Sequence, residues 1–275
     1  MKVVFNTMFK NEAVLLNAVL AIWIKYPIDL FIFYDDNSTD DSLSVIEKYL
    51  PRGRFIIIND KLPLFNESYQ RQKMIDVSLD NNADIIFSID SDELLTSTIV
   101  AEFDVFLNFY KKYDMRLFWY NSCNDSLKYY RNDPAYQNNY RTFVLPTRNM
   151  GRLDANDWKY HTPRTPNITL PNIITKKYGV IHLQAINKKY YAIKQLWYKH
   201  YEFIKYGHTV EFINSRYDYV VNQLNFKDTE IDEKLIDGIV FDDSIFNNLA
   251  VEKGYLKFIH EHYNEKLITF GKEFL

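Results

Sequence analysis

Glycine is scarce in this sequence: only 7 of its 275 residues are glycine. No two of them stand close enough to form a G-x-G-x-x-G fingerprint or a Walker loop, both of which cradle phosphates on closely spaced glycines. The sequence therefore argues against dinucleotide binding by the usual fingerprint and against a P-loop nucleotide site.

Cysteine and long apolar runs are nearly absent as well. The one cysteine, Cys123, excludes an internal disulfide framework and suits a reducing compartment. The first residues hold no apolar stretch of signal-peptide length, and no window approaches 18 uninterrupted apolar residues, so we expect a cytoplasmic chain without a membrane span. The net charge of −3 gives no global basic field, so we expect no nucleic-acid partner.

What is present is a regular alternation of β-rich and helical patterns over the first 95 residues. Continuous apolar runs such as LFIFY are typical of strands buried on both faces. We expect strands over residues 2–7, 30–34, 55–58 and 84–89, and helices over residues 12–26, 41–50 and 65–79. This order predicts an α/β fold, with a mostly parallel central sheet joined by right-handed crossovers and flanked by helices.

The rest of the chain is less regular. We expect a helix over 96–113, strands over 115–120, 140–145 and 178–183, long loops over 121–139 and 146–177, and an aromatic helix over 187–206 before a mainly helical end. This pattern predicts one domain over residues 1–185 and a helical C-terminal extension over 186–275, packed on the same domain.

Acidic residues follow two of the expected strands, and ligands of parallel sheets bind beyond the carboxyl ends of strands. Asp90, Ser91 and Asp92 follow the fourth strand. Residues two apart in a strand point the same way, so Asp90 and Asp92 could both reach one Mg²⁺ or Mn²⁺ ion, which takes oxygen ligands. The alternative is an acidic turn that caps the next helix.

A second acidic cluster, YDDNSTDDS, follows the second strand. Asp36 could accept hydrogen bonds from a base or a ribose, while Thr39 or Asp40 would cap the following helix. A calcium loop starting at Asp36 is the rival interpretation, but Asp41 stands where such a loop needs glycine, and a strand precedes it instead of a helix. A pure helix cap without any ligand is the third possibility.

These motifs together, with a helix that bears Gln and Arg between them, resemble the family 2 glycosyltransferases of the GT-A (Rossmann-like) fold. The resemblance covers residues 1–95. It implies a nucleotide-sugar donor, usually a UDP-sugar, and a divalent metal, Mn²⁺ or Mg²⁺, bound through Asp90 and Asp92. It also implies a donor site built from Thr7, Asn11, Asp36, Arg71, Asp90 and Ser91.

Beyond residue 95 the stretch DANDWKYHTPRTP is similar to a subgroup related to lipopolysaccharide-core transferases, which implies a glycan or lipid-linked glycan acceptor. His161 is followed by Thr162, where that subgroup often has Glu. His182 ends an expected strand, and the resemblance implies that a histidine placed there completes the metal site. A histidine with a purely structural role is the alternative.

Glycosyl transfer with inversion needs a general base, normally a carboxylate, on the face of the sugar opposite the diphosphate. Asp157 and Asp154 lie in the right part of the chain for this role, and Glu93 is a third candidate. The alternative for both aspartates is a loop acid that forms a turn.

The helix over residues 188–206 interleaves aromatic and basic residues, so it could lie on the inner face of an anionic membrane. The alternative is a helix that packs its rings on the protein and leaves its lysines in water. For the whole chain, two rivals to a sugar transferase stay open. One is a nucleotidyltransferase, a class that usually has a glycine-rich loop after the first strand; it is disfavoured because no glycine precedes Gly53. The other is a non-catalytic sugar- or protein-binding relative.

Overall fold

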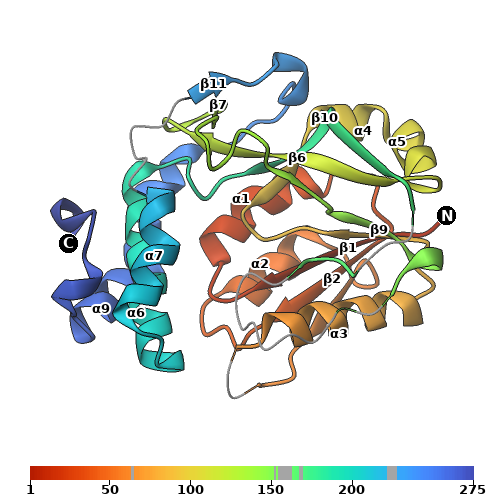
Figure 1. Cartoon of the computed structure of the whole chain (residues 1–275). Helices are drawn as coiled ribbons and strands as arrows, with labels where there is room; N and C mark the ends of the chain where they lie inside the picture. The colour runs from red at the N-terminus through yellow and green to blue at the C-terminus, as the bar shows by residue number, and fades with distance from the viewer. Residues whose placement is uncertain (63–64, 152, 154–162, 167–169, 222–227) are drawn as a thin grey trace. The chain divides into compact units, whose positions relative to one another are not determined.

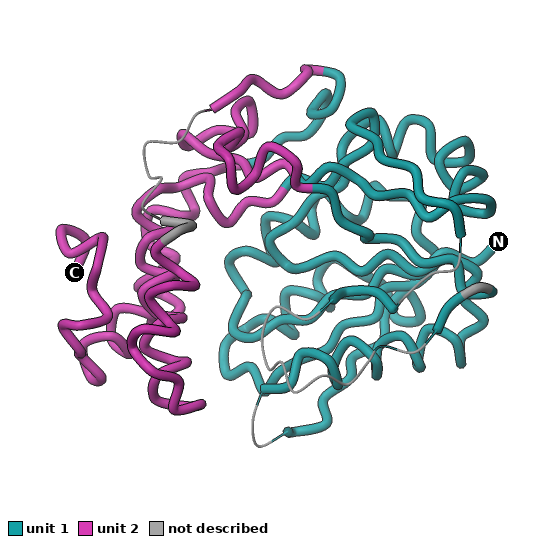
Figure 2. The backbone as a smooth tube through the Cα atoms, viewed as in Figure 1, with its two compact units in different colours: residues 1–119, 140–181, 234–241 teal, residues 120–139, 182–233, 242–275 magenta. Residues whose placement is uncertain are grey.

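The computed structural model describes residues 1–62, 65–151, 153, 163–166, 170–221 and 228–275 (Figure 1). The chain forms two compact units, which Figure 2 distinguishes by colour. Unit 1 comprises residues 1–119, 140–181 and 234–241, and unit 2 comprises residues 120–139, 182–233 and 242–275. Residues 120–139 thus group with the C-terminal part of the chain, while the assignment of one catalytic domain to residues 1–185 stays a prediction.

Unit 1 contains a five-stranded sheet with the order β3-β2-β1-β4-β9. The strands are β1 (Val3–Phe9), β2 (Leu30–Asp35), β3 (Phe55–Ile58), β4 (Ile85–Ser88) and β9 (Val144–Pro146). The first four run parallel, and β9 joins β4 antiparallel at the edge. This confirms the predicted α/β class with a mostly parallel central sheet flanked by helices.

Both faces of this sheet are covered by helices because its strands carry apolar residues on each side. The helices are α1 (Ala13–Trp23), α2 (Ser42–Tyr49) and α3 (Glu67–Asp80). Val4 and Ile32 pack with Met74 and Ile75 of α3, whose ribbon runs along the sheet in Figure 1. On the opposite face the ring of Phe5 lies 4.9 Å from that of Trp23, in α1.

The prediction of one continuous helix over residues 96–113 is wrong, because the structure has two short helices there. The structure has the three-residue strand β5 (Glu93–Leu95), then α4 (Ser97–Ala101) and α5 (Phe103–Tyr110). The break falls at Glu102, whose φ of −112° and ψ of 31° are not helical. The carboxylate of Glu102 accepts a hydrogen bond of 2.6 Å from Tyr178 Oη. This tertiary contact at the break has no signal in the local sequence.

The long loops expected over 121–139 and 146–177 are partly wrong, because each contains a strand. The second sheet has the order β11-β7-β6-β10-β5, and β8 pairs with β6. Its remaining strands are β6 (Asp114–Cys123), β7 (Ser126–Arg131), β8 (Tyr140–Arg141), β10 (Asn172–His182) and β11 (Asp228–Glu230). Residues 172–175 of β10 alternate exposed and half-buried positions before two exposed lysines. Because this part of the strand meets water, its sequence is polar enough to resemble a loop.

A tight hairpin joins β6 to β7 in unit 2. Its two loop residues, Asn124 and Asp125, have φ angles of 59° and 50°. Two-residue hairpins favour positive φ at both central positions, and Asn and Asp tolerate this conformation best after glycine. The Asn-Asp pair is the sequence signal for this hairpin.

The helices of unit 2 are α6 (Lys188–Tyr206), α7 (Val210–Val221), α8 (Phe246–Glu252) and α9 (Tyr255–Glu261). Short 3-10 turns occupy Glu233–Leu235, Asp243–Ile245, Glu265–Leu267 and Lys272–Phe274 in the C-terminal part, and Thr147–Asn149 in unit 1. The α6 helix begins after Asn187, whose side chain accepts from Tyr190 N–H at 2.8 Å, and ends at Gly207, where φ is 65°.

The aromatic residues of α6 pack within unit 2. The ring of Trp197 lies 4.8 Å from that of Tyr255, and the ring of Tyr201 lies 5.9 Å from that of Phe258. These contacts support the packing alternative for this helix. The expectation that its lysines are in water is wrong for Lys199, which is fully buried with Nζ 2.7 Å from an oxygen of Asp218. Across the described ranges, no helix combines the length and apolar character needed to cross a membrane.

Candidate functional site

The candidate site of unit 1 lies where the parallel strands end. The chain runs from β1 outward to β2 and β3, and then returns to β4 on the other side of β1. Such a reversal of strand order marks the crevice in which open α/β sheets bind ligands. Lys10 follows β1, Asp36 follows β2 and Asp90 follows β4, so these three side chains belong to the same edge of the sheet.

The loops after β1 and β2 are tied together by Asn11. This residue has a φ of 52°, its side-chain oxygen accepts from Thr39 N–H at 2.7 Å, and its own N–H donates to Ser38 Oγ at 2.9 Å. Asp40 accepts from Ala13 N–H at 3.0 Å and so caps the start of α1. The expected cap of the following helix is only partly present: Asp40 accepts from Ser42 N–H at 3.1 Å, but the N-cap residue of α2 is Asp41, whose side chain makes no cap bond. The polar residues of YDDNSTDDS therefore shape the loop.

Asp36 is held from two sides. Gln70 Nε2 donates to its Oδ1 at 3.0 Å, and Lys10 Nζ lies 3.3 Å from its Oδ2. Burial raises the pKa of Asp36 above its ordinary value, against the opposing effect of Lys10 and Gln70. The side chain is 7% exposed, so the carboxylate has a fixed position at the crevice.

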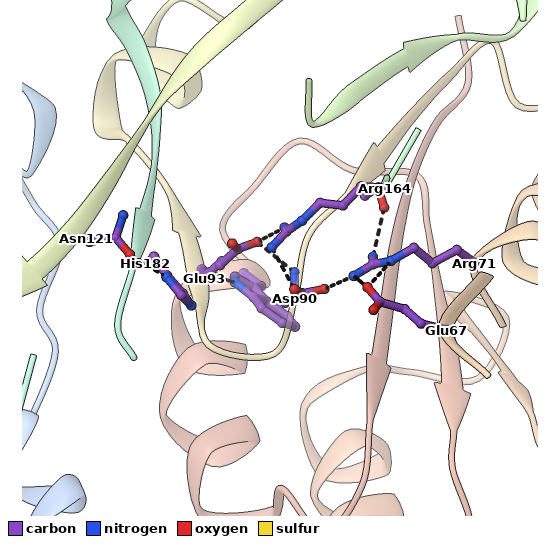
Figure 3. A network of polar contacts seen from close by, with 9 residues as sticks. Glu67, Arg71, Asp90, Glu93, Asn121, Arg164 and His182 are labelled. Carbon is purple, nitrogen blue, oxygen red and sulfur yellow. Dashed lines mark hydrogen bonds and ion pairs between the residues drawn. The ribbon is translucent and has the colours of Figure 1, made fainter. Parts of the chain in front are cut away.

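Asp90 lies between two guanidinium groups, as Figure 3 shows. Arg71 Nη2 donates to Oδ1 at 3.0 Å, and Arg164 Nη2 donates to Oδ2 at 2.7 Å. Burial works to raise the pKa of Asp90, but the positive charges of Arg164 and Arg71 outweigh it and hold that pKa below its usual value. The carboxylate is therefore ionised and oriented, with 26% of its side chain exposed.

Arg71 is fixed by further bonds on its own helix. Its Nε and Nη2 donate to Glu67 Oε1 at 2.9 and 2.7 Å, and only 4% of its side chain is exposed. Gln70, the residue before it, holds Asp36. Two consecutive residues of α3 thus hold the acid that follows β2 and the acid that follows β4.

Arg164 is a site residue that the sequence analysis did not select. Its Nη1 pairs with Glu93 Oε2, and its guanidinium carbon lies 5.2 Å from the ring centre of Trp119 and 5.1 Å from that of Phe143. Its side chain is 14% exposed. The only signal in the sequence is an arginine between two prolines in TPRTP, which says nothing about its partners.

Glu93 closes a turn with Asp90. Its N–H donates to the Asp90 carbonyl at 3.1 Å, and its Oε2 accepts from Asp90 N–H at 2.9 Å. Its side chain is fully buried. These contacts support a positioning role for Glu93 toward Asp90 and Arg164, and its role as a general base stays a prediction.

This turn changes the argument for a metal site. Because β4 ends at Ser88, the side chains of Asp90 and Asp92 do not alternate as in a strand, and that premise was wrong. Both oxygens of Asp90 already accept from arginines. Within the described ranges, no group of three or more His, Cys, Asp or Glu side chains could hold a metal ion. As arranged, these residues do not fit a divalent cation, and metal binding stays a prediction.

The other predicted residues are distributed as follows. Thr7 and Ser91 are buried, at 1% and 7% exposure. His182 belongs to unit 2, where its Nδ1 lies 2.8 Å from Asn121 Oδ1; a proton on Nδ1 leaves Nε2 as the acceptor nitrogen, the form that binds metals. Asp154 and Asp157, like His161 and Thr162, lie outside the described residues. Their roles stay predictions.

Comparison with known proteins gives structural similarities only. No protein-family model and no curated protein matches the chain. The structure is similar to that of S. aureus TarS 1-349, with 13% identity and a TM-score of 0.46 over 82% of this chain and 71% of that one. TarS 1-349 in complex with UDP-GlcNAc matches with 15% identity and a TM-score of 0.37, over 43% of this chain and 35% of that one.

A third similarity is to glucosyl-3-phosphoglycerate synthase from Mycobacterium tuberculosis in complex with phosphoglyceric acid. It has 16% identity and a TM-score of 0.27, over 34% of each chain. The match to the UDP-GlcNAc complex thus spans about a third of the length of that TarS chain.

Proposed function

We propose that this protein transfers a sugar from a nucleotide-sugar donor, a UDP-sugar, to a glycan or lipid-linked glycan acceptor, with inversion at the transferred sugar. The observation that carries the proposal is the pair Gln70 and Arg71 on α3, which holds Asp36 and Asp90 at one edge of the sheet. The two acids lie at the carboxyl ends of β2 and β4, on either side of β1. This is where an α/β sheet places a nucleotide.

In this proposal Asp36 accepts hydrogen bonds from the base or the ribose. Its carboxylate is pre-oriented by Gln70 and Lys10, so little side-chain entropy is lost when the ligand binds. At the other end of the donor, Asp90 positions Arg71 and Arg164. Fixed positive groups stabilise the charge that develops on a leaving diphosphate, and they do so most strongly where water is excluded.

The acceptor side of the reaction rests on the resemblance. Asp157 or Asp154 is proposed as the general base that takes the proton of the acceptor hydroxyl. Metal binding through Asp90, Asp92 and His182 stays a prediction. No step of this proposal depends on it, because both oxygens of Asp90 already accept from arginines.

The proposal is tested by thermal unfolding in the presence of UDP-, GDP- and CMP-sugars, with EDTA and with Mn²⁺. A donor at 100 times its dissociation constant stabilises the folded state by about 2.7 kcal/mol, which raises the Tm of a chain of this size by several degrees. Asp36→Asn is expected to remove most of this shift. Asp80→Asn changes an exposed acid at the end of α3 and should preserve it. The absence of a shift with every nucleotide-sugar under both conditions would contradict the proposal.

A further inference from the structure

One oxygen of Asp90, Oδ2, already accepts a hydrogen bond from a positively charged side chain of the protein, Arg164. We propose that the guanidinium of Arg164 takes the place of a divalent metal at Asp90, so that the protein binds the diphosphate of its donor without a metal ion. This inference rests on the proposed function, because it names the group that meets the diphosphate in the same site.

The position of Arg164 is fixed by charge and by shape together. Two carboxylates hold the two ends of its guanidinium: Asp90 Oδ2 at 2.7 Å from Nη2, and Glu93 Oε2 against Nη1. The rings of Trp119 and Phe143 lie about equally far from the guanidinium carbon, at 5.2 and 5.1 Å. Arginine stays charged at every physiological pH, so this site keeps its cation whatever the supply of metal.

The two arginines at Asp90 have different parts in this arrangement. Arg71 donates to Glu67 through Nε and Nη2, and its side chain is 4% exposed. It is therefore buried and holds Asp90 in position. Arg164 is 14% exposed, and its two ion pairs use one N–H on each terminal nitrogen. A guanidinium has five N–H donors in a planar fork that matches phosphate oxygens. Arg164 is therefore the one of the two that can contact a diphosphate.

A metal ion at the same place would meet two obstacles. It needs carboxylate oxygens as ligands, while Oδ1 and Oδ2 of Asp90 accept from Arg71 and Arg164. It would also lie beside two fixed positive charges, which repel it. A divalent ion could bind to Asp90 Oδ2 only after Arg164 left Asp90 and Glu93, and both carboxylates would then lose their ion pair with Arg164.

The inference is tested by titration calorimetry of the full chain with UDP and with inorganic pyrophosphate, which reports the diphosphate without a base. In the wild-type protein the affinities in EDTA and in Mn²⁺ should agree within twofold. Arg164→Gln should weaken both ligands at least tenfold in EDTA. The matched control, Arg148→Gln, removes an exposed arginine near the amino end of β4 and should change neither affinity.

A second readout follows the metal itself. By electron paramagnetic resonance, the wild-type protein should bind no Mn²⁺ at submillimolar concentrations, whereas Arg164→Gln should gain a site because the positive charge on Asp90 Oδ2 and Glu93 Oε2 is removed. If Arg164→Gln does not fold, Arg164→Lys keeps the charge but lacks the fork, and should still weaken pyrophosphate binding. The wild-type measurements need no variant.

The outcomes separate this inference from the proposed function. UDP binding that requires Mn²⁺ would overturn the inference and leave the proposed function standing. An unchanged affinity for pyrophosphate in Arg164→Gln would also overturn it. If neither UDP nor pyrophosphate binds under either condition, the donor site itself is wrong and both proposals fall.

Discussion

Replacing Arg71 by methionine tests whether the ion pairs of α3 hold the candidate site together. The substitution leaves Glu67 buried and without the guanidinium that it accepts from at 2.7 and 2.9 Å. Removing one partner of a buried ion pair costs about 3–5 kcal/mol. Asp90 keeps its ion pair with Arg164 and is 26% exposed, so the loss of Arg71 costs less free energy at Asp90 than at Glu67. We expect a loss near the lower end of this range, about 3 kcal/mol.

Urea denaturation measures this loss directly. With a slope of about 2 kcal/mol per molar urea, a loss of about 3 kcal/mol lowers the midpoint by about 1.5 M. The double variant Glu67→Met/Arg71→Met removes both charges, and should recover most of the stability because no uncompensated charge remains buried. Arg148→Met, at an exposed position, should stay within about 0.5 kcal/mol of the wild type.

The same pairing predicts how stability depends on pH. The pKa of Asp90 is lower in the folded protein than its ordinary value of 3.8. Its stabilising contribution is therefore complete above that ordinary value and is lost as the pH falls through the folded value. Arg71→Met should weaken this acid dependence.

A loss of unfolding free energy below about 1 kcal/mol in Arg71→Met at pH 7, or an equal loss in the double variant Glu67→Met/Arg71→Met, would refute the reasoning.

Three further changes test other parts of the structure. Burial raises the pKa of Asp36, so ionising this carboxyl in the folded protein reduces stability as the pH rises above the ordinary carboxyl pKa. Asp36→Asn should therefore have an equal or higher urea midpoint at pH 7, and it should bind UDP more weakly. Lys199 is fully buried beside Asp218; Lys199→Met should destabilise less than Asp218→Ala in thermal unfolding, because only the second leaves a buried charge without its partner. Burial raises the pKa of Cys123 to about 12, so a thiol reagent should label it only as fast as unit 2 opens, and rapid labelling at pH 8 would contradict this.

The β-α alternation of the first 95 residues was predictable from sequence because each strand there is an uninterrupted apolar run. LFIFY is buried at every position, and such a run has few alternatives to a central strand. The strands of the second sheet were missed where one face meets water. Residues 172–177 combine exposed and half-buried positions, and their pairing partners are distant in sequence. Local periodicity carries no information on such partners.

The candidate site divides in the same way. Asp36 and Asp90 were predictable, since each directly follows an apolar strand of a parallel sheet. Arg164 was not, because its contacts with Asp90 and Glu93 span more than 70 residues of sequence. The alternation argument for Asp90 and Asp92 failed because the chain turns at Asp90, where the Glu93 carboxylate bonds back to the Asp90 N–H.

The most direct test of this account is a crystal structure of the protein with UDP bound in the presence of EDTA. The account predicts a diphosphate in contact with Arg164, and a base or ribose in contact with Asp36, at the carboxyl ends of β2 and β4. A nucleotide bound elsewhere on the protein, or no nucleotide at this edge of the sheet at saturating concentration, would contradict it.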